Sequence, residues 1–161
     1  MIGFLARLFA RGEPVLSEAR ARDAAALADL HAASFRRGWS DGEFERLLLE
    51  RNTVAHRAMT GRRLDGFILS RLVAGEAEIL SVAVASARQG RGLARALLNL
   101  HLRRLAGLGA RAVFLEVDED NEPARRLYQR AGFREVGRRP GYYRQPNGNA
   151  ATALVLRRDL V

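Results

Sequence analysis

The chain has 161 residues, of which 48% are hydrophobic and 28% charged, the balance expected of one globular domain with a sizeable core. It contains no cysteine and three histidines. This composition excludes disulfide bonds and thiol catalysis, and it predicts no metal site. The lack of cysteine also fits a cytoplasmic protein.

The net charge is +9, and all 27 basic residues are arginine. Such a charge attracts phosphate, acidic proteins or nucleic acid. The arginines are spread along the whole chain, however, and no nucleic-acid motif accompanies them. We therefore expect no direct nucleic-acid partner, and a biased composition explains the arginines as well as a function does.

Residues 1–13 form an N-terminal extension ahead of the domain at 14–161. Apolar side chains recur there at helical spacing and predict a short amphipathic helix. The segment is too short to span a membrane, and Arg7 interrupts any signal-peptide core. Two interpretations stay open, a helix packed on the domain and a weak contact with a membrane surface or a partner.

The first elements of the domain are a strand at 15–19 and a helix capped by Asp23, whose apolar stripe is Ala26, Leu27 and Leu30. Ser40 and Glu43 form a capping box that opens a second helix, which runs to Leu49. Trp39 immediately precedes this box. It is placed either to staple the start of the helix or to line a binding site.

Three antiparallel strands follow, at 53–59, 67–73 and 77–84, with turns at Gly61 and near Gly75. A glycine-containing turn, Gln89-Gly90-Arg91-Gly92, then connects the last strand to a leucine-rich helix. Glycines allow a ligand to approach the backbone closely, and a helix start presents unpaired N–H donors, so this order predicts an anion site. A simple tight connection is the alternative. The turn is no Walker A loop, because the chain lacks lysine.

The helix after Gly92 carries apolar residues on one side, and His101 lies on that stripe, where we expect a histidine at the edge of the core. The stripe consists of Ala94, Leu97, Leu98, Leu105 and Leu108. A strand at 112–117 follows, and Asn121 and Pro123 then begin a further helix that closes at Gly132.

The chain ends in a predicted strand pair at 133–137 and 153–156, joined by a loop at 140–148. The element order is β-α-α-β-β-β-α-β-α-β-β. This is a mixed α+β pattern and differs from the repeating βαβ of a doubly wound fold.

The glycine turn resembles the acetyl-CoA signature [QR]-x-x-G-x-[GA] of the GNAT N-acetyltransferase superfamily, and the segments around it resemble the RimI-like ribosomal-protein alanine N-acetyltransferases. The signature residues are Gln89, Gly92 and Ala94. The surrounding segments are Phe35, Gly38-Trp39-Ser40, Ser81 to Val84, Leu115-Glu116-Val117, Asn121, Ala124, Leu127-Tyr128, Ala131-Gly132-Phe133, Val136 to Arg139 and Tyr142-Tyr143. The resemblance covers about 14–160.

The resemblance implies a mostly antiparallel twisted sheet flanked by helices. The strand before the turn would carry a bulge and splay from the next strand, and acetyl-CoA would enter the gap as co-substrate. It assigns backbone contacts with the pantetheine arm to Val82, Ala83 and Val84. It assigns the pyrophosphate to the turn and helix start, residues Gln89, Gly90, Arg91, Gly92, Leu93, Ala94 and Arg95. Part of the local positive charge then matches this polyanionic ligand.

The resemblance places a general base at Glu116 and a general acid at Tyr128. An α-amine, with a pKa of about 7.7–8.0, must lose a proton before it attacks, and a thiolate leaving group must gain one. Asn121 would contact the cofactor, cap its helix or do both. Residues 118–120, all acidic, would attract a cationic peptide terminus or simply face solvent.

The acceptor side departs from the family, with Gly141 in place of an asparagine and with Ala151 and Thr152 in place of an acidic pair. Trp39 and Tyr142 are the expected substrate contacts. The sequence thus predicts an acetyl-CoA-dependent N-α-acetyltransferase of a protein N-terminus, specifically the N-terminal alanine of a small-subunit ribosomal protein, without stable membrane insertion. The alternatives are an acetyltransferase for lysine side chains or small amines, and a CoA-binding module without catalysis.

Overall fold

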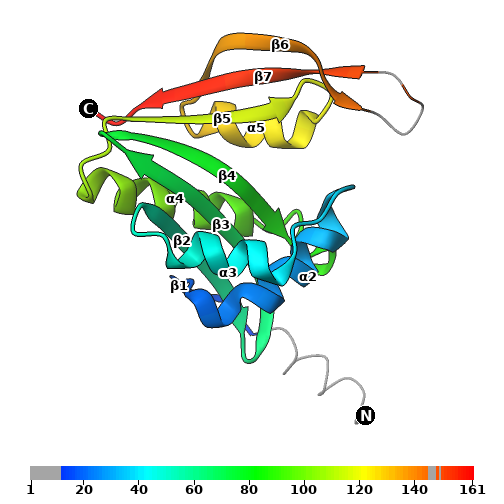
Figure 1. Ribbon diagram of the computed structural model, residues 1–161, viewed down its shortest axis with the longest axis vertical. Helices are drawn as coiled ribbons and strands as arrows, with labels where there is room; N and C mark the ends of the chain where they lie inside the picture. Colours follow the sequence, from blue (N-terminus) through cyan, green and yellow to red (C-terminus); the bar gives the residue numbers. More distant parts are fainter. Residues whose placement is uncertain (1–11, 145–147, 149) are drawn as a thin grey trace.

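The computed structural model describes residues 12–144, 148 and 150–161, and it contains one seven-stranded sheet with the order β1-β2-β3-β4-β5-β7-β6. Helices α2 and α3 cover one face of the sheet, and α4 and α5 cover the other (Figure 1). The predicted helix at 1–13 lies almost entirely outside the described residues. The elements are β1 (Val15–Glu18), η1 (Ala21–Asp23), α2 (Ala24–Ser34), α3 (Asp41–Leu49), β2 (Thr53–Thr60), β3 (Arg63–Val73), β4 (Glu76–Val84), η2 (Ser86–Arg88), α4 (Leu93–Gly107), β5 (Ala112–Asp118), α5 (Glu122–Arg130), β6 (Arg134–Arg144) and β7 (Ala150–Asp159).

The start of α2 differs in detail from the prediction. Asp23 occupies the N-cap position, but its side chain makes no capping hydrogen bond to α2. Its carboxylate instead accepts from the backbone N–H of Arg20 and pairs with Arg57 at 2.5 Å, because a short 3₁₀ turn precedes the helix. The buried stripe also shifts, since Leu27 is buried whereas Ala26 is exposed.

The start of α3 confirms the predicted capping box. The Ser40 hydroxyl accepts from the Glu43 N–H at 3.2 Å, and the Glu43 carboxylate accepts from the Ser40 N–H at 2.7 Å. Trp39 stands one residue before the cap and packs on Phe44, the fourth residue of the helix, with ring centroids 5.3 Å apart. This contact is a hydrophobic staple, one of the two interpretations that the sequence left open for Trp39.

Strands β2, β3 and β4 form the predicted antiparallel meander, and β4 carries a bulge. Leu69 pairs with Ser81 while Ser70 pairs with Ile79, so Leu80 is the extra residue. The bulge reverses the alternation of the strand. Ile79 and Val82, three positions apart, therefore join the same core cluster on the α4 side.

The two central strands, β4 and β5, run parallel but pair only at one end. Their ladder consists of Glu76 with Ala112, Ala77 with Val113, and Glu78 with Phe114. Beyond it the strands diverge, and the gap between them opens toward the α4 N-terminus (Figure 1). The splay implied by the family resemblance is thus confirmed.

Helix α4 lies against β3 along a buried stripe that includes His101, which has no exposed surface. The predicted stripe is right at Leu97, Leu98 and Leu105, but Leu108 lies beyond the helix and is 43% exposed. A Cβ at Gly66 would come within 3.0 Å of the Leu97 side chain, so glycine at this position lets α4 pack closely on the sheet.

The last two strands are longer than predicted. Strand β6 continues through Pro140 to Arg144, a stretch that the sequence assigns to a loop. Proline is tolerated there because β6 is the edge of the sheet and its outer side needs no ladder partner. A register shift between Arg139 and Tyr143 accommodates Pro140 and Gly141, whose φ is +70°.

Candidate active site

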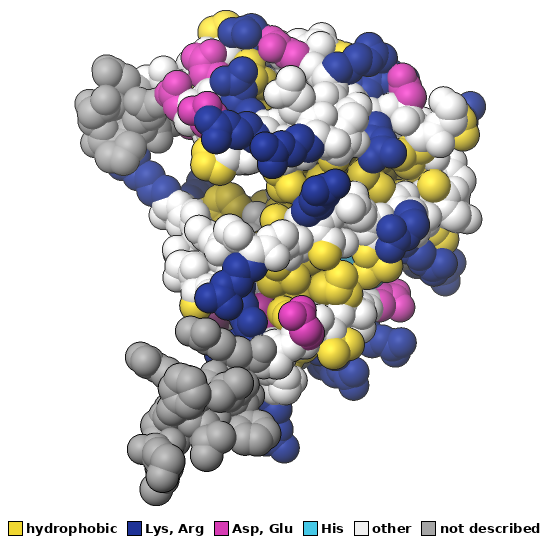
Figure 2. All heavy atoms as spheres, turned by 180° about the vertical axis from the view of Figure 1, so that it is seen from behind, with side chains coloured by type: hydrophobic (Ala, Val, Ile, Leu, Met, Phe, Trp, Pro, Cys, Tyr) yellow, Lys and Arg dark blue, Asp and Glu magenta, His cyan; other side chains and the backbone are white. Residues whose placement is uncertain are grey.

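The open gap between β4 and β5 continues into a cavity of about 1070 Å³ bounded by α4 and α5. Beyond Glu78 the β5-facing edge of β4 has left the ladder, so its backbone groups are available to an extended ligand. The cavity lining includes Val82, Ala83 and Val84 from this edge. Figure 2 shows the hollow between the upper and lower parts of the molecule, with arginine side chains along its rim.

The glycine turn forms one end of the cavity. Gly90 and Gly92 have φ of +74° and +81°, a conformation that favours glycine. The first intrahelical bond of α4 runs from the Ala96 N–H to the Gly92 carbonyl, so the N–H groups before Ala96 are unpaired within the helix. Gln89 donates from its side-chain amide to the Val84 carbonyl at 3.1 Å and thereby holds the turn against the end of β4.

A buried ion pair between Arg88 and Asp65, which the sequence analysis did not predict, anchors this turn to β3. Arg88, 7% exposed, lies 3.4 Å from the carboxylate of Asp65, which is completely buried. Arg88 also donates to Thr60 Oγ1 at 3.1 Å, and the Ala85 N–H donates to the Asp65 carbonyl at 2.8 Å. The turn is therefore fixed to the β2–β3 hairpin. Asp65 precedes the strand predicted at 67–73, and nothing in the sequence around it pointed to Arg88.

Helix α5 forms the other wall of the cavity. Asn121 caps it, accepting from the Ala124 N–H at 3.3 Å, and the same residue lines the cavity. Tyr128 also lines the cavity and is 7% exposed, with its ring against Phe133 at 5.6 Å. Tyr128 shares its core cluster with Leu115, so it lies on the α4/α5 side of β5.

Glu116 lies on the opposite face of β5. Side chains alternate along a strand, and Leu115 and Val117 on either side of Glu116 both belong to the cluster that contains Tyr128. The two candidate catalytic residues thus flank the gap from opposite faces. The Glu116 side chain is 21% exposed, and its Oε1 lies 3.2 Å from Arg139 Nε.

Trp39 is on the same face as Glu116, within the core cluster of α2 and α3. Its ring stacks on the His31 ring with the centroids 4.7 Å apart, and the backbone N–H of Trp39 donates to His31 Nδ1 at 3.1 Å. Burial lowers the pKa of His31, although Glu43 opposes this shift, and the lowered pKa favours the neutral ring that can accept that bond. Tyr142 is 53% exposed and lies beneath the Arg139 guanidinium, 5.4 Å from the ring centroid.

The structure therefore divides the predicted site residues between two places. The cavity collects most of the predicted cofactor contacts together with Tyr128, namely Val82, Ala83, Val84, Gln89, Gly90, Gly92, Leu93, Ala94, Arg95 and Asn121. Arg91 is not part of this lining. Glu116 and Trp39 belong to the other face, and Tyr142 lies beneath Arg139, which pairs with Glu116 there, so these three residues are outside the cavity.

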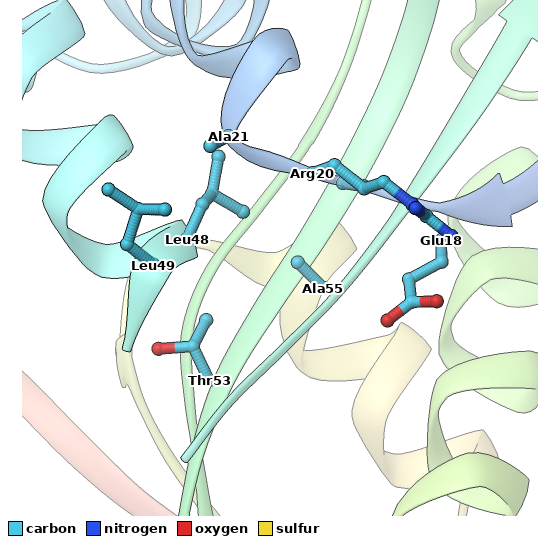
Figure 3. A pocket seen from close by; sticks show the side chains of 8 residues that line it. Glu18, Arg20, Ala21, Leu48, Leu49, Thr53 and Ala55 are labelled. Atoms are coloured by element: carbon cyan, nitrogen blue, oxygen red, sulfur yellow. The ribbon is translucent and has the colours of Figure 1, made fainter. Parts of the chain in front are cut away.

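A second, smaller cavity of about 400 Å³ lies between η1, the end of α3 and the strands β1 and β2. It contains none of the predicted site residues (Figure 3). Thr53 Oγ1 is buried beside it without a hydrogen-bond partner. Across the described residues, no group of three or more His, Asp or Glu side chains could hold a metal ion. No helix in the same ranges is long and apolar enough to cross a membrane.

Comparison with known proteins links this geometry to a family. Residues 24–133 match the Acetyltransferase (GNAT) family. The chain is 30% identical to the ribosomal protein bS18-alanine N-acetyltransferase of Haemophilus influenzae, over 88% of this chain and 96% of that protein. It is 36% identical to the N-alpha-acetyltransferase RimI of Mycobacterium tuberculosis, over 91% of this chain and 94% of that one. The crystal structure of the ribosomal-protein-S18-alanine N-acetyltransferase from Escherichia coli has the same fold, with a TM-score of 0.85 at 24% identity, covering 91% of this chain and 94% of that one.

Proposed function

Because the chain belongs to the GNAT acetyltransferase family, with acetyl-CoA as co-substrate, we propose that it is an N-α-acetyltransferase of protein N-termini. We propose the N-terminal alanine of a small-subunit ribosomal protein as acceptor, in keeping with the activity that names the Haemophilus relative, and the cytoplasm as its place of action. The observation that carries the proposal is a cavity lined by the unpaired edge of β4, the glycine turn and Tyr128, with Glu116 on the opposite face of β5.

The described residues fit acetyl-CoA in shape and charge. An added Cβ at Gly90 or Gly92 would enter open space, so the turn leaves room for phosphate groups beside its N–H donors. Arg95 lines the same cavity and supplies positive charge. The free backbone edge at 82–84 suits the two amide groups of a pantetheine arm, and Asn121 would add a polar contact.

Acetyl-CoA supplies an activated acyl group, and the chain's own residues supply the proton transfers. Glu116 would accept a proton from the amine, directly or through water, because it faces the side from which a peptide can approach. Tyr128 would donate a proton to the departing sulfur, because it lies on the cofactor side. Because the base and the acid lie on opposite faces, the proton that leaves the amine and the proton that reaches the sulfur are transferred at separate places.

The acceptor side carries uncharged residues at the positions where the family resemblance implies an acidic pair. Ala151, 3% exposed, and Thr152 occupy the places of the family's acidic pair, and the Thr152 carbonyl accepts from the Glu119 N–H at 2.9 Å. Trp39 would form one wall of the peptide path and Tyr142 the other. The Trp39 ring is already held by His31 and Phe44, so a peptide would meet a rigid surface.

Peptides that begin with Ala, Ser or Met test the proposal when each is compared with the same peptide blocked at the α-amine and carrying a free lysine. We expect acetyl transfer to the free α-amine, fastest for Ala, with little transfer to lysine. Equal rates on both sets would replace the proposal with the lysine acetyltransferase alternative. Acetyl-CoA binding without any turnover would instead support a non-catalytic CoA-binding module.

A further inference from the structure

Arg139 is ion-paired with the Glu116 carboxylate, which is the group that an incoming amine has to reach. Its Nε lies 3.2 Å from Glu116 Oε1, and the two side chains are 57% and 21% exposed. Both residues lie on the same sheet face, because their partners on β7, Ala153 for Arg139 and Val155 for Glu116, are two positions apart. The Arg139 side chain reaches Glu116 across the small side chain of Ala153.

The local sequence of β6 holds Arg139 in this position. Two extra residues between Arg139 and Tyr143, at Pro140 and Gly141, interrupt the ladder with β7. The resulting bulge brings the Tyr142 ring beneath the guanidinium, at 5.4 Å from the centroid. The same Gly141 that departs from the family pattern thus helps to place a positive charge beside Glu116.

The positive charge of Arg139 changes how strongly Glu116 attracts a charged acceptor. A free carboxylate attracts any ammonium group, whereas a carboxylate already paired with arginine is close to neutral as a unit. An acceptor that carries a full positive charge must displace Arg139, while a neutral amine need not. Asp118 on β5 and Arg139 on β6 both pair with Ala153 of β7. A second carboxylate therefore lies close to an Arg139 guanidinium that has been displaced from Glu116.

We propose that Arg139 is a specificity-determining residue, which selects against a fully charged attacking nitrogen and so favours an α-amine over a lysine. An α-amine has a pKa of about 7.7–8.0 and is partly neutral near pH 7.5, whereas a lysine, at about 10.4, is almost entirely cationic. The inference rests on the proposed function in that Glu116 receives the acceptor amine.

The test measures competitive inhibition by two peptides that differ only in the charge at their N-terminus. One is trimethylated at the α-nitrogen and permanently cationic, and the other is acetylated there and neutral. In Arg139→Gln, the inhibition constant of the cationic peptide should fall by about two- to five-fold, the range expected for an exposed ion pair. The inhibition constant of the neutral peptide should stay the same in Arg139→Gln. For both peptides, Arg139→Lys should give the wild-type inhibition constants.

Arg138→Gln is the matched control, because Arg138 is the neighbouring arginine, is 54% exposed and pairs with Glu135 and Glu119 instead. It should leave both constants unchanged, and the effect of Arg139→Gln should shrink at high salt. The inference is overturned if Arg139→Gln leaves binding of the cationic peptide unchanged or weaker, if it strengthens both peptides alike, or if Arg138→Gln has the same effect. A wild-type enzyme that acetylates only lysine would refute the proposed function separately.

Discussion

Nδ1 of His56 lies 2.7 Å from Nδ1 of His101 in the interior between β2 and α4. On its other side, His101 Nε2 lies 2.6 Å from Ser70 Oγ. Only one of the two facing Nδ1 atoms can carry the shared proton, so at least one ring has to be neutral there. Burial and the neighbouring His56 lower the pKa of His101 to about 3. Burial lowers the pKa of His56 too, where Glu18 opposes the shift and Arg104 adds to it.

Stability should therefore decrease as the pH falls below neutrality. In the unfolded chain a histidine takes up a proton near pH 6.5, whereas folded His101 does so only near pH 3. Between these values the unfolded state binds more protons, and each such histidine adds a slope of at most about 1.4 kcal/mol per pH unit. Urea denaturation from pH 7 to pH 5 should show the free energy of unfolding falling. In His101→Gln this slope should be smaller, and parallel curves for the two proteins would contradict the prediction.

Gly92→Val should abolish most acetyl-CoA binding, because a side chain at this position would enter the space beside the turn. Its φ of +81° also makes any other residue strained, by about 1–3 kcal/mol. Gly109→Val is a suitable control, since Gly109 has a φ of +92° and equally open surroundings but lies beyond the other end of α4. Calorimetry should detect lost affinity only in Gly92→Val. Similar affinity in both folded variants would be evidence against the cofactor placement.

Tyr128→Phe should reduce the turnover rate by a factor on the order of 10² to 10⁴ if the phenol is the general acid. The phenylalanine ring keeps the packing against Phe133, so acetyl-CoA affinity should change little. Steady-state rates measured alongside calorimetric affinities separate the two effects. A wild-type rate in Tyr128→Phe would leave this residue with a packing role only.

Glu116→Gln should lower the rate near neutral pH and recover part of it at higher pH. The recovery follows because an α-amine loses its proton in solution above its own pKa of about 8, so the base is needed less. A pH–rate profile from pH 6.5 to 9.5 should show the variant approaching the wild type. Glu119→Gln removes a nearby carboxylate that pairs with Arg138, and it should follow the wild-type profile. A constant deficit across the pH range would rule out simple removal of an amine proton.

Many features of the fold could be predicted from short stretches of sequence. The capping box at Ser40 and Glu43, the cap at Asn121 and the positive-φ turn at Gly92 all depend on neighbours within a few residues. Such signals survive in the sequence because the partners are adjacent in the chain. The family motifs extended this reading to Glu116 and Tyr128, whose opposite placement across the β4–β5 gap followed only from the structure.

Tertiary structure decided the features that depend on pairing between distant segments. The position of the β4 bulge at Leu80, the anchoring of Arg88 on Asp65 and the contact between Arg139 and Glu116 all depend on how different elements meet. The adjacent apolar residues Ile79 and Leu80 broke the alternation of β4, but only pairing with β3 shows which one is extra. Side-chain periodicity specifies which face of an element is buried, whereas the register between strands specifies which residues meet, and register is set by the packing of the whole sheet.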